Sequence, residues 1–205
     1  TPVMLDADGK YRMQPIHKGG TYYRMNTDTD EEYYLFECRS NDSWDKYIGG
    51  SGMLVYHIDK TSERAWEYNI VNTRPTHQNA DLIEADGRTN SLNEYNYAQL
   101  MGNLKGLFFP YNKVNSLTAE TTPGLKFWSG NKCGISVTNI RREGRNITFS
   151  VSGFEGEEPP LAVNLTVTSF MDAAIIRFES DRPYSNEATV TWKKTGGEDE
   201  DTVMV

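Results

Sequence analysis

The feature that most constrains the fold is a hydrophobic period of two residues. It is clearest in the segment 53–59, which follows a glycine-rich interruption at 49–52. Successive side chains of a strand point to opposite faces, so this period predicts a strand. Its two faces carry Leu54, Tyr56 and Ile58 on one side and Met53, Val55, His57 and Asp59 on the other. The strand therefore ends with a polar pair, His57 and Asp59, pointing the same way.

Similar patterns predict strands along most of the chain. We expect them at 11–16, 21–25, 33–39, 81–85, 134–140 and 146–151. The segment 33–39 is apolar on both faces in its first half, which indicates a central strand covered on two sides. We expect a packed loop or short helix at 61–76 and a long loop at 86–132. The predicted fold is all-β, a β-sandwich-like domain with long loops.

An acidic, proline-ended stretch at 155–160 predicts a linker between two parts of the chain. Residues 1–154 then form the first β domain. Beyond the linker, alternating segments at 162–168, 173–179 and 188–192 resemble the opening of a fibronectin type III domain. Residues 161–205 are therefore expected to be a partial fibronectin III-like β-sandwich.

Charge and hydropathy exclude two classes of partner. The net charge is −8, and no dense cluster of Lys and Arg is present, which argues against nucleic acid and against an anionic membrane surface. No run reaches the 18 or so apolar residues that a membrane-spanning helix needs. The tyrosine-rich, aromatic composition is typical of a secreted or cell-surface protein. Because Thr1-Pro2 is not a natural start, we expect a mature or excised piece.

The two cysteines, Cys38 and Cys133, leave two readings open. They can form one disulfide, or they can remain buried thiols. Cys38 lies in a predicted strand between Glu37 and Arg39, a setting in which cysteine usually serves as a small core residue. We therefore expect buried thiols, with the disulfide as the alternative.

Carboxylates and histidines near the ends of two strands suggest candidate sites. Asp59, Glu84 and Asp86 lie beside a long Asn- and Gly-rich loop and could bind calcium, which prefers several oxygen ligands. His57, Asp59 and His77 are compatible with zinc, but their spacing is nonspecific, so hydrogen-bonded structural histidines are the expected role. Glu84 and Asp86 on one strand face are also a conceivable acid/base pair.

Aromatic side chains provide a separate binding hypothesis. If they are exposed, Trp44, Trp66 and Trp128 could stack on sugar rings, as in carbohydrate-binding modules. Packing in a β core is the more common role for such residues. The candidate binding residues are therefore His57, His77, Trp44 and Trp66.

The central stretch resembles a known family. Its landmarks are Trp44 to Tyr47, Gly52 to Asp59, Trp66, Asn69, Val71-Asn72, His77-Gln78 and Asp81 to Asp86. Together they resemble the M6 (immune inhibitor A-like) secreted metalloproteases, in the part that follows the zinc-binding helix. The resemblance covers about residues 10–152. Gly49-Gly50 replaces a proline common in the family, and Cys38 stands where the family often has Asn.

The resemblance implies a zinc-dependent parent protein. The family's catalytic motif is His-Glu-x-x-His, in which two histidines bind zinc and the glutamate activates the metal-bound water. In this chain His17, His57 and His77 are followed by Lys, Ile and Gln, so the motif is absent from this sequence. The chain by itself is expected to be inactive, and zinc belongs to the catalytic domain of the presumed parent.

Two functional hypotheses follow from the sequence. The first is a noncatalytic accessory segment of a secreted M6-like zinc metalloprotease. It would support the upstream catalytic domain of the same polypeptide and help to place protein substrates. The alternative is a free-standing secreted module that binds glycans or proteins.

Overall fold

The computed structural model describes residues 1–88 and 96–154 and the backbone of four later strands, 163–169, 174–180, 189–193 and 200–204. The chain divides into two compact units, Thr1–Gly156 and Glu157–Val205. The linker predicted at 155–160 lies outside the described residues. No helix in the described part is long and apolar enough to cross a membrane.

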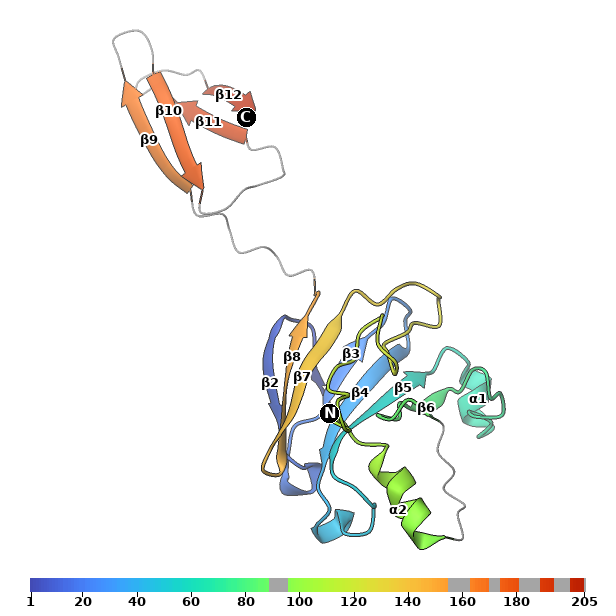
Figure 1. Cartoon of the computed structure of the whole chain (residues 1–205). Helices are drawn as coiled ribbons and strands as arrows, with labels where there is room; N and C mark the ends of the chain where they lie inside the picture. The colour runs from blue at the N-terminus through green and yellow to red at the C-terminus, as the bar shows by residue number, and fades with distance from the viewer. Residues whose placement is uncertain (89–95, 155–162, 170–173, 181–188, 194–199, 205) are drawn as a thin grey trace. The chain divides into compact units, whose positions relative to one another are not determined.

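The larger sheet of the first unit has five strands in its described part. They are β1 (Val3–Met4), β3 (Tyr23–Asn26), β4 (Glu32–Arg39), β5 (Gly52–Asp59) and β6 (Ala80–Leu82), in the spatial order β1-β3-β4-β5-β6 (Figure 1). The β1–β3 pair is parallel and the other pairs are antiparallel. β4 is the central strand, as its apolar faces predict.

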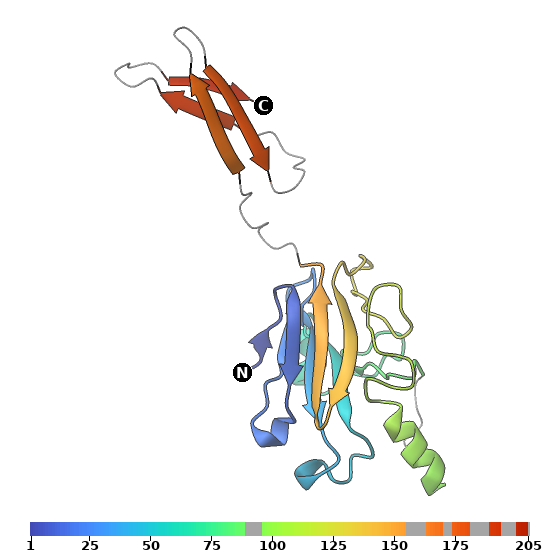
Figure 2. The ribbon, with the colours of Figure 1, turned by 60° about the vertical axis from the view of Figure 1, so that its left-hand side comes forward.

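The smaller sheet consists, in the same part of the chain, of β2 (Gly9–Met13), β8 (Asn146–Ser152) and β7 (Ser136–Glu143), in that order. Figure 2 shows these three strands side by side in front of the larger sheet. The strands predicted at 134–140 and 146–151 are confirmed as the antiparallel pair β7–β8, with an irregularity between Thr138 and Arg141. Its inward face carries Ile147, Phe149 and Val151, all buried.

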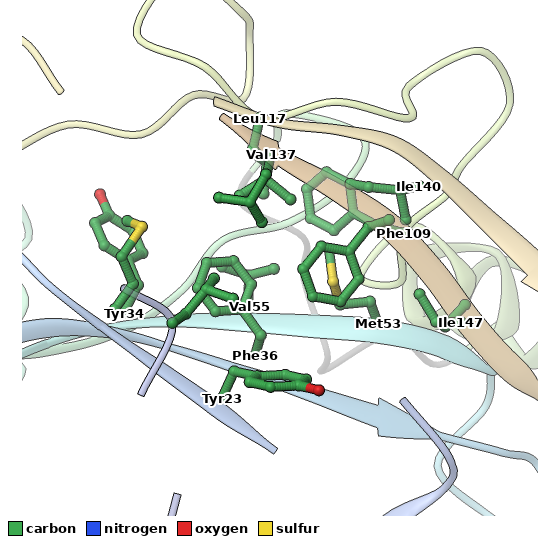
Figure 3. Close-up of a cluster of buried hydrophobic side chains, with 14 of the residues drawn as sticks. Tyr23, Tyr34, Phe36, Met53, Val55, Phe109, Leu117, Val137, Ile140 and Ile147 are labelled. Atoms are coloured by element: carbon green, nitrogen blue, oxygen red, sulfur yellow. The ribbon is translucent and has the colours of Figure 1, made fainter. Parts of the chain in front are cut away.

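The main hydrophobic core fills the space between the two sheets (Figure 3). Fully buried side chains come from both sheets and from the segment between α2 (Tyr97–Lys105) and β7. They include Tyr34, Phe36, Met53 and Val55 from β4 and β5, Val137, Ile140 and Ile147 from β7 and β8, and Phe109 and Leu117 from the connecting segment. Burying each such large side chain stabilises the fold by roughly 1.5–3 kcal/mol. Two sheets sharing one core make the first unit a mostly β structure.

A second, smaller cluster covers the other face of β5. Leu54 packs there with Leu107 and Phe108, and Leu104 packs against this cluster. Leu104 belongs to α2 (Tyr97–Lys105), whose first turn is capped by Asn96, a side chain that accepts from the backbone N–H groups of the next turn. The side chains of β5 thus alternate between the main core and this smaller cluster, as the sequence pattern predicts.

The helical segments were only partly predicted. Residues 61–76 contain α1 (Glu63–Glu67), as expected of a short helix, with Ser62 as its N-cap. The region 86–132, expected to be a loop, contains α2. Two 3-10 turns, η1 (Ile16–Lys18) and η2 (Ser43–Asp45), complete the described helical segments.

The segment that follows α2 connects the two sheets. Phe109 exchanges two backbone hydrogen bonds with Met53 of β5, at 2.8 and 2.9 Å. Further on, Leu117 exchanges two with Val137 of β7, at 2.7 and 2.8 Å. The long loop is therefore anchored to both sheets.

The described strands of the second unit form two antiparallel pairs. β9 (Val163–Ser169) pairs with β10 (Ala174–Ser180), and β11 (Thr189–Lys193) pairs with β12 (Glu200–Met204). The sequence predicts the first three of these strands. β12 lies in an acidic, weakly alternating segment, which explains why the pattern did not indicate it.

The two cysteines are buried free thiols. Burial raises the pKa of Cys38 to about 11, and its thiol lies 3.4 Å from the carbonyl oxygen of Arg145. The expectation of core thiols is confirmed, and the alternative disulfide is not formed.

The core makes a direct prediction for stability. Phe36 is fully buried between the sheets, so Phe36→Ala should lower the free energy of unfolding by about 3–5 kcal/mol because it leaves a cavity. Urea denaturation measures the change. Tyr47→Ala is the control, because Tyr47 is 85% exposed and should change stability by about 0.5 kcal/mol or less. Equal losses in the two variants would contradict this description of the core.

Candidate functional site

The register between β4 and β5 assembles a polar group at one end of the larger sheet. Glu32 lies opposite Asp59, and Tyr34 lies opposite His57. All four side chains are on the strand faces turned toward the main core, and all four residues are buried. Buried polar groups need partners, so the contacts of these side chains define the site.

His57 is paired with Glu32. Its Nε2 lies 2.7 Å from Glu32 Oε1, and the same oxygen accepts from the backbone N–H of Trp128 at 3.0 Å. Burial lowers the pKa of His57, although the hydrogen bond and charge of Glu32 act in the opposite direction. The neutral ring must therefore donate from Nε2, because a carboxylate can only accept.

Asp59 is the second centre of the site. Its Oδ1 accepts from the backbone N–H and the hydroxyl of Thr61, at 2.8 and 2.6 Å. Its Oδ2 lies 2.6 Å from His77 Nε2 and accepts from Asn79 Nδ2 at 3.2 Å. Burial alone would raise the pKa of Asp59, but the bonds from Thr61 and His77 outweigh it and lower the pKa. We call Glu32, His57, Asp59 and His77 the histidine–carboxylate network.

Aromatic stacking joins the two halves of the network. The Tyr34 ring stacks on His57 with centroids 4.3 Å apart, and His57 lies parallel to Trp128 at 5.5 Å. Trp128 in turn stacks on His77 at 3.8 Å. The Tyr34 hydroxyl also donates to the carbonyl oxygen of Lys126 at 2.6 Å. The network therefore fixes the segment around residues 126–128 to the sheet.

A cavity of about 300 Å³ opens beside this stack. Tyr34, His57 and Trp128 contribute to its wall, together with the carboxylates of Asp81 and Glu84. Burial raises the pKa of both carboxylates, and for Glu84 the charge of Asp81 adds to the effect. We call this space the acidic cavity.

The structure does not gather into one group the three carboxylates that the sequence suggested as calcium ligands. Asp59 bonds Thr61 and His77, Glu84 faces the acidic cavity, and Asp86 accepts from the backbone and side chain of Arg88. Within the described residues no group of three or more His, Cys, Asp and Glu side chains could hold a metal ion. The geometry thus gives no support to calcium at Asp59, Glu84 and Asp86, or to zinc at His57, Asp59 and His77.

The tryptophans have different positions. Trp66 Nε1 donates to the carbonyl oxygen of Asp59 at 2.8 Å, so it supports the network. Trp44 lies apart on η2 with 89% of its surface exposed. Of the candidate binding residues, the structure brings His57, His77 and Trp66 together around Asp59 and leaves Trp44 outside.

Sequence reasoning missed the role of Glu32. The acidic, polar composition of 26–32 predicts a solvated hairpin tip, yet Glu32 is 1% exposed. Glu32 precedes Tyr34 and Phe36 at even spacing, so the strand alternation places all three on one face. That spacing was the available signal. Trp128 gave no comparable signal, because 96 residues separate it from Glu32.

Comparison with protein-family models, with curated proteins and with solved structures gave no match to this chain.

The network predicts the effect of neutralising Asp59. Asp59→Asn removes the charge that His77 and Thr61 stabilise, and should lower the free energy of unfolding by about 1–3 kcal/mol at pH 7. The native pKa of Asp59 is below its ordinary value. Its contribution is therefore complete above the unfolded pKa and is lost as the pH falls through the native pKa.

Urea denaturation at pH 7 and at pH 3 measures this difference. The difference in the free energy of unfolding between wild type and Asp59→Asn should be smaller at pH 3 than at pH 7. Asp30→Asn serves as the matched control, because Asp30 is exposed and should behave like wild type at pH 7. A loss for Asp59→Asn no larger than that of the control would contradict the network.

Proposed function

We propose that this chain is a noncatalytic β accessory segment of a secreted M6-like zinc metalloprotease. In this proposal residues 1–154 form a β-sandwich-like domain that supports the upstream catalytic domain of the same polypeptide. Residues 161–205 form part of a fibronectin III-like module. The parent's protein substrates are placed with the help of the β domain.

The observation that carries this proposal is the resemblance of the central stretch, combined with how its histidines are used. His57 and His77 bond Glu32 and Asp59 and stack with Trp128. His17 lies between two carboxylates, with Nδ1 3.2 Å from Asp45. These imidazoles stabilise the β domain. Such a structural role is consistent with a β domain that supports a separate catalytic domain.

The alternative is a free-standing secreted module that binds glycans or proteins. The exposed aromatic pair Trp44 and Tyr47, 89% and 85% exposed, favours this alternative for a protein partner. A glycan is less favoured at Trp128, because its stacking with His77 uses aromatic surface that a sugar ring would need. Retention on polysaccharide affinity gels would favour the glycan-binding form of the alternative.

The coding sequence upstream of Thr1 tests the proposal. We expect a His-Glu-x-x-His helix in the same reading frame within about one domain length. We also expect the purified chain, supplied with zinc, to leave fluorescent casein uncleaved. A signal peptide directly before Thr1, or an upstream sequence without the motif, would contradict the proposal and support a separate binding module.

A further inference from the structure

The acidic cavity has two carboxylates in its wall. Asp81 and Glu84 both line it, and neither has an ion-pair partner within the described residues. Burial and mutual repulsion hold the pKa of Glu84 above its ordinary value. Such an arrangement costs stability unless a cation enters the cavity.

Part of the remaining wall is apolar and aromatic. This part consists of Tyr34, Trp128, Ile83 and Pro123. The rings are held in place by the stack on His57, so this wall is formed before any ligand arrives. A ligand that fits must combine an apolar body with a positive head.

Lysine and arginine side chains have this combination, with a methylene stem and a charged end. We propose that the acidic cavity binds a basic side chain of a polypeptide, with the stem along Tyr34 and Trp128 and the head at Asp81 and Glu84. This inference deepens the substrate-placement part of the proposed function and rests on it for biological meaning. The binding itself is a property of this chain and is measured independently of any parent protein.

The positive groups at the cavity do not replace this ligand. Arg88 lines the cavity but bonds Asp86 through its guanidinium at 3.1 Å. Lys126 also lines the cavity, with an exposed side chain that forms no ion pair within 4.0 Å among the described residues. A divalent ion is less suited, because the described residues provide no group of three acidic, His or Cys ligands.

Titration of the full chain with blocked single residues tests the proposal. The probes are Nα-acetyl-lysine N-methylamide and Nα-acetyl-arginine N-methylamide, with the norleucine analogue as the uncharged match. Amide chemical shifts in NMR spectra report the site. We expect shifts at Asp81, Glu84 and Trp128 with the basic probes and none with norleucine, and the two basic probes show which head is preferred.

Glu84→Gln is the decisive variant. It should weaken binding of the preferred basic probe about tenfold, because one charge-assisted hydrogen bond is lost. Glu143→Gln, on the exposed part of β7, is the matched control and should bind as wild type does. Glu84→Gln should also stay folded with unchanged or higher thermal stability at pH 7, since it removes a half-buried charge.

Three results would overturn the inference. One is equal binding of the norleucine and lysine probes. Another is unchanged affinity in Glu84→Gln. The third is a response of Asp81 and Glu84 to calcium chloride but to neither basic probe, which would indicate an ion site instead. None of these results bears on the upstream coding sequence, so failure here is distinguishable from failure of the proposed function.

Discussion

The register of β4 against β5 is the constraint on which the rest of the site depends. Eight residue pairs fix it, from Glu32 opposite Asp59 to Arg39 opposite Gly52. A slip of one residue would turn the inward side chains of β5 to the opposite face. His57 and Asp59 would then lose Glu32 and His77, while Met53 and Val55 would leave the main core. The core and the histidine–carboxylate network are therefore determined by the same register.

The network also determines where a distant part of the chain lies. Glu32 accepts from the backbone of Trp128, and the Tyr34 hydroxyl both donates to and accepts from the backbone of Lys126. A segment without regular structure has few other ways to satisfy its backbone groups away from water. Hydrogen bonds from buried side chains of β4 thus replace a neighbouring strand. Trp128 is placed against His57 and His77 as a result.

The hydrophobic pattern of the sequence was sufficient to predict the strands, but not the residues that their side chains contact. The hydrophobic period of two residues predicted β4, β5, β7 and β8, and it placed His57 and Asp59 on one face. It could not show that Trp128 stacks on both histidines, because that contact depends on the path of a loop with no periodicity. Asp59 and Asp86 were grouped from their sequence positions, but hydrogen bonds turn Asp59 toward Thr61 and Asp86 toward Arg88. Side-chain direction beyond a strand end follows such contacts, which the sequence pattern does not encode.

The carboxylates at this end of the sheet fall into two groups whose pKa values are shifted in opposite directions. Asp59 receives bonds from neighbouring groups, which lower its pKa, whereas burial raises the pKa of Asp81 and Glu84. Positive groups are present in the same region, since Lys126 lines the cavity that contains Asp81 and Glu84. The fold therefore gives Asp59 several hydrogen-bond donors, whereas Asp81 and Glu84 form no ion pair among the described residues. If stability were the only requirement, Asp81 and Glu84 would also be expected to have ion-pair partners. The free-energy cost of burying their charges is best accounted for by the binding role proposed for the cavity.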